Sequence, residues 1–283
     1  MNKLPIERRA QILACLVEGN SMRATARLCG ISINTVVKMV CDAGEACTRY
    51  MDKAFRNLSC ERLQADEVWS FIGAKEKNAT PENRTAKGHG DCWTWTAIDA
   101  DTKLIPAWYV GTRDAMAAYR FMNDLASRLS NRVQLTTDGH RAYLQAVEDA
   151  FGDGIDYAML VKIYGPSAEG ASVRYSPAPC TGASKNVVCG QPEKEHVSTS
   201  FVERANLTIR MGNRRFTRLT NAFSKKLTNH KHSVALTLMH YNFCRIHSSL
   251  RCTPAMEAGI SAKVWELSDI VALIDQMEME KAA

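Results

Sequence analysis

Apolar and polar residues alternate along residues 62–72, RLQADEVWSFI, as they do in a β-strand that turns one face to a core. Two further segments, 92–98 and 104–110, repeat β-branched and aromatic residues and are separated by a short turn. These three segments predict consecutive antiparallel strands. The stretch 74–91 between the first two is rich in Lys, Asn, Glu, Pro and Gly, so we expect an exposed hairpin loop there.

Helical and strand patterns alternate after the third strand. Apolar residues recur every three or four positions over 115–129 and 141–151, which predicts helices, and strand-like runs occupy 132–137 and 157–164. Three strands, helix, strand, helix and strand are the order of a ribonuclease H-like mixed sheet with flanking helices. The stretch 165–197 is rich in Gly, Pro, Ser and Cys and lacks either period, so we expect an inserted surface loop.

The first fifty residues have helical spacing throughout. One helix is predicted over 4–17, a second begins after the capping residue Ser21, and a third runs over 33–41 after a turn at Gly30. Two short helices joined by such a turn are typical of a helix-turn-helix, although a small helical domain with no role in DNA binding has the same pattern. In the helix-turn-helix interpretation, the residues placed to reach base edges and phosphates are Ser32, Asn34, Thr35 and Lys38.

The chain is long enough, at 283 residues with 46% hydrophobic residues, for one full core and a small second domain. We therefore expect an α/β protein in which an all-α helix-turn-helix domain precedes a ribonuclease H-like domain. The predicted boundaries are 1–58 for the DNA-binding domain with its charged connector, 59–258 for the catalytic domain with its two inserted loops, and 259–283 for a helical tail.

Charge and cysteine content refine this picture only slightly. The 36 Lys and Arg residues exceed the 30 Asp and Glu residues, and the formal charge of +6 fits a polyanionic partner without requiring one. The basic residues concentrate in 204–231. No two of the ten cysteines form a CxxC pair, so we expect reduced thiols and no structural zinc. No signal peptide or membrane span is evident, and we expect a cytoplasmic protein associated with the nucleoid.

Three carboxylates have positions from which they can converge. Asp66 lies within the first predicted strand, Asp138 ends the fourth, and Glu203 lies on a helix capped by Ser198 or Thr199. Ligands collect where central strands of an open sheet end. Clustered carboxylates repel one another unless cations neutralise them, and oxygen ligands select Mg²⁺ or Mn²⁺. Two such ions about 4 Å apart activate an attacking hydroxyl and stabilise the leaving oxygen in phosphoryl transfer.

Neighbouring polar residues have simpler interpretations. Glu67 points to the face of the strand opposite Asp66, where we expect it to be solvated or to sit behind the ligands. Asp99 is predicted to be a turn residue and Asp114 a helix cap. His140 either contacts substrate near the metal or makes an ordinary hydrogen bond at a helix start.

Several segments resemble transposases of the insertion sequence 1 family, over about residues 62–258. They are DEVWSFIGAK (66–75), TTDGHRAYL (136–144), FVERANLTIRMGNRRFTRLTNAFSKK (201–226) and ALTLMHYNF (235–243). The resemblance implies a DDE transposase, whose ribonuclease H-like domain cuts at the element ends and joins the free 3′-hydroxyls to target DNA. The chain departs from shorter members of the family in the length of its two insertions and in the absence of zinc-ribbon cysteines.

The resemblance also implies the roles of individual residues. Asp66, Asp138 and Glu203 correspond to the catalytic, metal-binding triad, with two Mg²⁺ or Mn²⁺ ions as cofactors. Arg210 follows Glu203 by seven residues, two helical turns along one face, so it can grip a phosphate beside the metals. Further candidates for DNA contact on the same segment are Arg204, Asn206 and Arg214.

The implied partners are the terminal inverted repeats and the target DNA, with no membrane. Because two element ends must be held together, we expect a homodimer or a larger assembly on DNA. Two other functions remain open from the sequence. One is a non-catalytic DNA-binding regulator derived from a transposase, and the other is a nuclease that hydrolyses strands without joining them.

Overall fold

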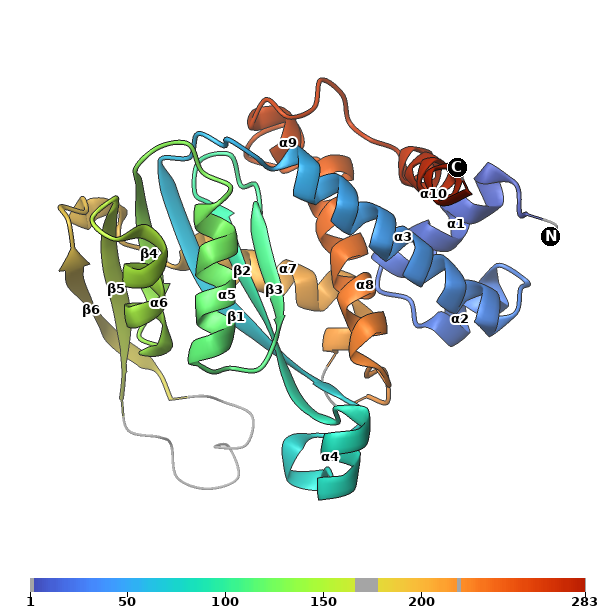
Figure 1. The fold of residues 1–283 in the computed structure, drawn as a ribbon, viewed down its shortest axis with the longest axis horizontal. Helices are drawn as coiled ribbons and strands as arrows, with labels where there is room; N and C mark the ends of the chain where they lie inside the picture. Colours follow the sequence, from blue (N-terminus) through green and yellow to red (C-terminus); the bar gives the residue numbers. More distant parts are fainter. Residues whose placement is uncertain (1–2, 166–177, 218–219, 283) are drawn as a thin grey trace.

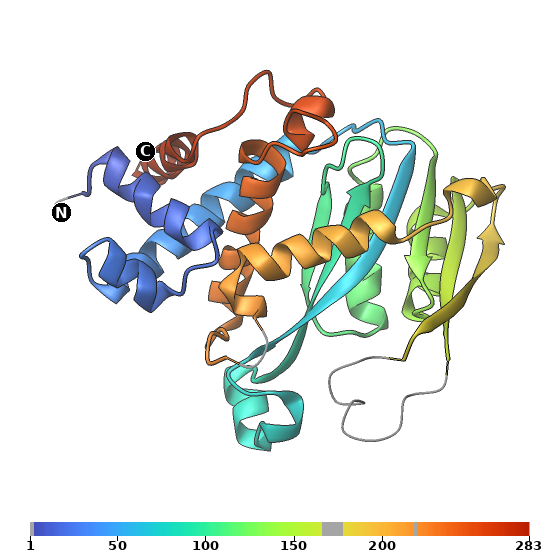
Figure 2. The same cartoon turned by 180° about the vertical axis from the view of Figure 1, so that it is seen from behind.

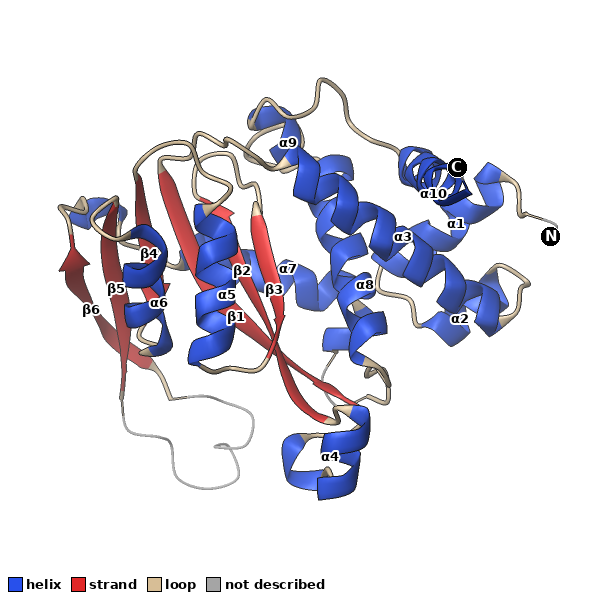
Figure 3. Ribbon diagram, viewed as in Figure 1, coloured by secondary structure: helices blue, strands red, loops and turns tan. Residues whose placement is uncertain are grey.

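The computed structural model describes residues 3–165, 178–217 and 220–282, and these form one six-stranded mixed sheet with helices around it (Figures 1 and 3). The strand order is β3-β2-β1-β4-β5-β6, with β1 antiparallel to β2 and parallel to β4. This arrangement fits the predicted ribonuclease H-like sheet. The strands are β1 (Arg62–Ile72), β2 (Gly90–Asp99), β3 (Ala107–Gly111), β4 (Val133–Asp138), β5 (Ile155–Tyr164) and β6 (Cys180–Cys189).

Helices cover both faces of the sheet at β1. Helices α5 (Ala115–Ala126) and α6 (Ala142–Phe151) lie on one face in Figure 1, and α7 (Ser200–Gly212) crosses the other in Figure 2. Within β1, Ala65 and Val68 are completely buried, although their side chains point to opposite faces. A central strand covered on both sides places successive residues in two different protein environments, and this determines the surroundings of the carboxylates in β1.

The N-terminal helices pack against the rest of the molecule through one long helix. Residues 33–41, predicted to be the third helix, and the helical connector predicted after them form one continuous helix, α3 (Ile33–Ala54). Helix α3 runs beside α8 (Leu227–Met239), as Figure 1 shows. The two helices approach so closely that a Cβ atom at Gly44 would lie 2.3 Å from Cβ of His232. The other helices of this layer are α1 (Ile6–Val17), α2 (Met22–Leu28) and α10 (Leu267–Ala282).

The two predicted insertions are not structureless. Residues 180–189, within the loop predicted over 165–197, form β6, an antiparallel partner of β5, so the prediction is wrong there; residues 166–177 lie outside the described part. β6 lacks an apolar alternation because it is an edge strand whose side chains are mostly exposed. The 74–91 hairpin connection contains a short helix, α4 (Pro81–Lys87), capped by Thr80.

Shorter elements complete the fold. They are the 3₁₀ turns Glu76–Asn78, Lys194–His196 and Arg214–Phe216, the π-helical turn His240–Cys244 after α8, and α9 (Pro254–Glu257). Among the helices of the described residues, none combines the length and apolarity needed to cross a membrane.

A buried histidine ties α8 to the end of β1. His230 is completely buried between two hydroxyls, with Nε2 at 3.2 Å from Ser70 Oγ and Nδ1 at 3.0 Å from Ser224 Oγ. Because the Ser70 hydroxyl donates to the carbonyl of Cys92, Ser70 Oγ accepts from Nε2–H and Nδ1 accepts from Ser224. Burial, with a smaller effect of the Arg215 charge, lowers the pKa of His230 to about 3.

His230 should make folding stability depend on pH below 6.5. An unfolded histidine takes up a proton near pH 6.5, whereas the folded pKa of His230 is about 3, so its contribution falls as the pH drops from 6.5 toward 3. The expected slope is about 1.4 kcal/mol per pH unit. Urea unfolding of the wild type and of His230→Gln at pH 7 and pH 5 measures it. Equal losses of stability in the two proteins would contradict this account of His230.

Candidate active site

Asp66 and Asp138 lie side by side in the sheet. The parallel register pairs Ala65 of β1 with Thr137 of β4, so Asp66 and Asp138 are the next residues along two neighbouring strands. β4 ends at Asp138, whereas β1 continues to Ile72. β4 therefore ends beside the middle of β1, the position where ligands collect in an open sheet. The predicted adjacency of these two carboxylates is what the register produces.

Glu67 joins this pair, and of the two positions predicted for it, solvated or behind the ligands, the solvated one is wrong because the side chain is buried. One carboxylate oxygen from each of Asp66, Glu67 and Asp138 lies within 4.8 Å of the others. The Glu67 side chain is only 1% exposed, and its Oε2 accepts a hydrogen bond of 3.1 Å from Nε of Arg113. The alternation of β1 does direct Glu67 to the face opposite Asp66, but helices cover the face of Glu67 as well.

Burial makes the charged forms of two of these carboxylates costly. Desolvation is the largest cause that raises the pKa of Asp66 to about 6 and the pKa of Glu67 to about 7, and the charge of Asp138 adds to both shifts. Asn206 opposes the shift at Asp66, and Tyr143 opposes it at Glu67. A cation at this position would remove the repulsion and favour the ionised carboxylates.

Asn206 of α7 contacts Asp66 on the face of the sheet that α7 covers. Its Nδ2 donates to Oδ2 of Asp66 at 2.9 Å, and its Oδ1 accepts from the Thr96 hydroxyl at 3.1 Å. Asn206 is 3% exposed. The side chain of this predicted DNA-contact candidate is therefore engaged inside the protein, where Thr96 fixes which end of the amide faces Asp66.

Glu203 lies close to this cluster but has partners of its own. Its Oε1 accepts from Nζ of Lys162 at 2.5 Å and from the Thr199 hydroxyl at 2.6 Å. The charge of Glu203 is among the causes that raise the pKa of Asp66, so the two carboxylates interact electrostatically. The three carboxylates grouped within 4.8 Å among the described residues are thus Asp66, Glu67 and Asp138, with Glu203 beside them and paired with Lys162.

The cluster fits a hard divalent cation. Its donor atoms are all carboxylate oxygens, the ligand type that Mg²⁺ and Mn²⁺ prefer. The buried Glu67 carboxylate also has a donor in the Tyr143 hydroxyl, whose hydrogen bond lowers the pKa of Glu67 and so favours its ionised form in part.

The three arginine candidates differ in their exposure along α7 and the turn after it. Arg204 is exposed, Arg210 lies half-buried in the last turn, and Arg214 is half-buried in the 3₁₀ turn that follows. Three apolar side chains of α7 are also exposed, Phe201 at 39%, Leu207 at 41% and Met211 at 65%. The exposed side of this helix therefore combines basic and apolar groups.

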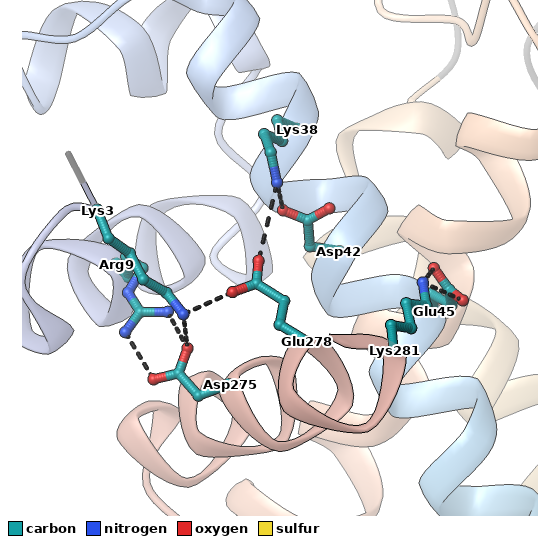
Figure 4. Close-up of polar contacts among 8 residues, drawn as sticks. All are labelled: Lys3, Arg9, Lys38, Asp42, Glu45, Asp275, Glu278 and Lys281. Atoms are coloured by element: carbon teal, nitrogen blue, oxygen red, sulfur yellow. Dashed lines mark hydrogen bonds and ion pairs between the residues drawn. The ribbon is translucent and has the colours of Figure 1, made fainter. Parts of the chain in front are cut away.

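The predicted DNA-reading residues of α3 lie at its first turns, opposite α10. Ser32 caps the helix by accepting from the backbone N–H of Asn34 at 3.0 Å. Figure 4 shows Lys38 paired with Asp42 on its own helix and with Glu278 of α10, the latter at 4.0 Å. Lys38 thus has two carboxylate partners within the same chain, and its side chain is 60% exposed.

A pocket of about 460 Å³ separates α3 from α10 at this point. Thr35 and Lys38 line one side of it, and Ile274 and Glu278 line the other. Below the pocket, Arg9 of α1 makes two hydrogen bonds with Asp275, of 2.6 and 2.8 Å, as Figure 4 shows. Helix α10 is therefore fastened to α1 and lies across from the first turns of α3.

Sequence reasoning did not identify three side chains that contact the carboxylates. Asn206 follows Glu203 by three residues and therefore shares its face of α7, a spacing that could have linked it to the same site. Arg113 and Lys162 carry no comparable signal. Arg113 precedes α5 and contacts β1, and Lys162 of β5 contacts α7, so both contacts depend on the tertiary fold.

The sheet order and the carboxylates at the end of β4 fit a ribonuclease H-like DDE domain. A family model described as a DDE domain, that of IS240-type transposases, matches residues 86–168. This segment includes β2 to β5 with Asp138, and the match supports a DDE transposase domain in this chain. IS240 is a different family from insertion sequence 1, so that closer assignment stays a prediction. No curated protein matches the chain.

Replacing Asn206 by Ala should slow metal-dependent cleavage of DNA about 10- to 100-fold, because Asp66 loses the amide that orients it. The rate at saturating DNA and the concentration of Mn²⁺ needed for half-maximal rate measure the effect. Thr208→Ala is a control on the same helix, since its hydroxyl donates to the carbonyl of Arg204. Equal rates for Asn206→Ala and the wild type would exclude a role of Asn206 in orienting Asp66 for cleavage.

Proposed function

We propose that the protein is a DNA transposase that binds the terminal inverted repeats of an insertion sequence and carries out metal-dependent strand cleavage and strand transfer. The finer assignment to the insertion sequence 1 family belongs to this proposal and rests on the sequence resemblance. The observation that carries the proposal is the position of Asp66 beside Asp138 at the end of β4, within a chain that matches a DDE domain.

Asp66, Asp138 and Glu203 are the proposed catalytic residues and metal ligands. Two Mg²⁺ or Mn²⁺ ions, when bound, would activate the attacking hydroxyl and stabilise the leaving oxygen. Asn206 orients Asp66, and Lys162 pairs with the Glu203 carboxylate until a metal binds. In the proposed reaction, water attacks at the element end first, and the freed 3′-hydroxyl then attacks target DNA.

The DNA is proposed to lie along α7 and at the N-terminal helices. Arg204, Arg210 and Arg214 follow α7 from the carboxylates outward and are proposed to bind phosphates. The proposed DNA-binding domain is 1–58, followed by the catalytic domain 59–258 and the tail 259–283. Since two element ends must be held together, the proposed active form is a homodimer or a larger assembly on DNA.

The test is cleavage of a labelled duplex that carries the inverted repeats bounding the element, with Mg²⁺ and a supercoiled target plasmid. We expect nicks at the element ends, followed by joining of the labelled 3′ ends to the plasmid. A protein that binds the duplex and never nicks it is the non-catalytic regulator. A protein that nicks but never joins strands is a nuclease. Either result would contradict the proposal.

The helix-turn-helix part of the proposal has its own test in Lys38. Lys38→Ala should weaken binding of the inverted-repeat duplex and reduce the slope of log affinity against log salt by about 1, as expected for the loss of one phosphate contact. Lys53→Ala, in the last turn of the same helix, is the matched control. An unchanged salt slope in Lys38→Ala would exclude a phosphate contact at this residue.

A further inference from the structure

Arg113 contacts the carboxylate cluster from the side of α5. It lies between β3 and α5, and its Nε donates to Oε2 of the buried Glu67 at 3.1 Å. Its Nη2 lies 3.7 Å from Oδ2 of Asp138, and its guanidinium carbon lies 4.8 Å from the centre of the Trp93 ring. Three neighbours thus hold the guanidinium, and 35% of the side chain remains exposed.

Three carboxylates this close together are stabilised by a nearby positive charge. Asp66, Glu67 and Asp138 bring three carboxylates within 4.8 Å of one another, and Glu67 is almost completely buried. Like charges at this spacing in a partly desolvated site repel strongly. Arg113 makes ion pairs with two of the three, whereas Asp66 is held by the neutral amide of Asn206. Arg113 is thus a cation paired with this cluster from the side of α5.

We propose that Arg113 is a positioning residue that acts as a resident counter-cation. Anchored by Glu67 and Trp93, it keeps Asp138 in place beside Asp66 and lets the carboxylates share one site before a metal binds. The inference rests on the proposed function in one respect, since it takes Asp66 and Asp138 as metal ligands. It adds a role for Glu67, which anchors the arginine in this arrangement.

Two opposite effects follow from this arrangement. The positive charge of Arg113 opposes the binding of a second cation nearby, so its removal tightens metal binding. The same removal frees Asp138 from its partner, so cleavage slows even when metal is saturating. A residue that only supported the local fold would weaken metal binding and cleavage together. Tighter metal binding with slower cleavage therefore distinguishes the proposed role.

The experiment is a titration of the full-length chain with Mn²⁺, in which electron paramagnetic resonance measures free Mn²⁺ without DNA. We expect Arg113→Met to lower the Kd for Mn²⁺ about tenfold and Arg113→Lys to stay close to the wild type. Glu67→Gln, which leaves Arg113 without its anchoring charge, should raise the Kd about tenfold. Arg120→Met is the matched control on the exposed side of α5 and should leave the Kd unchanged.

The second measurement is the rate of inverted-repeat cleavage at saturating Mn²⁺, where Arg113→Met should be at least about tenfold slower than the wild type. An unchanged or weaker Mn²⁺ affinity in folded Arg113→Met would overturn the proposal. If Arg113→Met does not fold, Glu67→Gln decides, and an unchanged Kd there would overturn it as well. A wild-type chain that binds Mn²⁺ with these shifts but never cleaves DNA would contradict the proposed function and leave the counter-cation role supported.

Discussion

Asp138→Asn should abolish Mg²⁺-dependent cleavage of an inverted-repeat duplex, with a rate at least about 1000-fold below that of the wild type. This corresponds to a loss of about 4 kcal/mol of transition-state stabilisation. The reason is that the substitution keeps the shape of the side chain but removes a charge from the pair that Asp66 and Asp138 form at the end of β4. Single-turnover cleavage, measured beside DNA binding in Ca²⁺, separates a catalytic loss from a binding loss.

Asp149→Asn provides the matched control, because Asp149 is exposed on α6 and pairs with Gln145 of its own helix. Its cleavage rate should equal that of the wild type. The fold of Asp138→Asn should be retained, since the substitution relieves repulsion with Asp66 and Glu67. Cleavage by Asp138→Asn at a rate within tenfold of the wild type would rule out Asp138 as a catalytic residue.

Gly44→Ala should destabilise the folded chain by about 3 kcal/mol, although alanine favours an isolated helix over glycine by about 1 kcal/mol. The added Cβ would lie 2.3 Å from Cβ and 2.4 Å from Cα of His232, so α3 and α8 would have to move apart. The measurement is the free energy of unfolding from urea denaturation, read by circular dichroism. The loss of stability measures how closely α3 packs against α8.

The control for Gly44→Ala is Gly182→Ala in β6, where the added Cβ would meet nothing within 4 Å and the backbone does not require glycine. Its stability should change by less than about 0.5 kcal/mol. A neutral or stabilising effect of Gly44→Ala would mean that α3 and α8 do not approach each other as closely as the structure has them.

The relation of Asp66 to Asp138 could be predicted from sequence because it depends on simple rules. Strand alternation placed Asp66 within β1, and the end of an apolar run placed Asp138 at the end of β4. A parallel pairing of the first and fourth strands then makes the two residues neighbours. The sequence order of the first five strands and the two helices among them was likewise predictable from the helical and strand periods, whereas β6 was not.

Other features depend on tertiary contacts that no local pattern records. A solvated position was one of the two predicted for Glu67, because a strand with one buried face exposes the other, but helices cover both faces of β1. β6 has no alternating pattern because its side chains are mostly exposed and its hydrogen bonds go to β5. Helix α3 continues past Cys41 and lies beside α8, where Gly44 meets His232.

The candidate site also has one part that could be predicted from the sequence and one part that could not. Its carboxylates could be proposed from sequence, whereas the side chains that balance their charge could not. Arg113 and Lys162 come from a loop and from β5, and each reaches a carboxylate far away in the chain, Glu67 and Glu203 respectively. An isolated arginine or lysine on the surface has no periodicity that would single it out. The contacts of Arg113 and Lys162 can be identified only from the folded arrangement of the sheet and α7.

Anomalous diffraction from crystals of the chain bound to an inverted-repeat duplex in Mn²⁺ tests whether the carboxylates at the end of β4 hold the metal used in DNA cleavage. We expect Mn²⁺ density between Asp66 and Asp138, with Glu203 released from Lys162 and turned to the metal. Density elsewhere in the complex, or none at this site with DNA bound, would contradict this expectation.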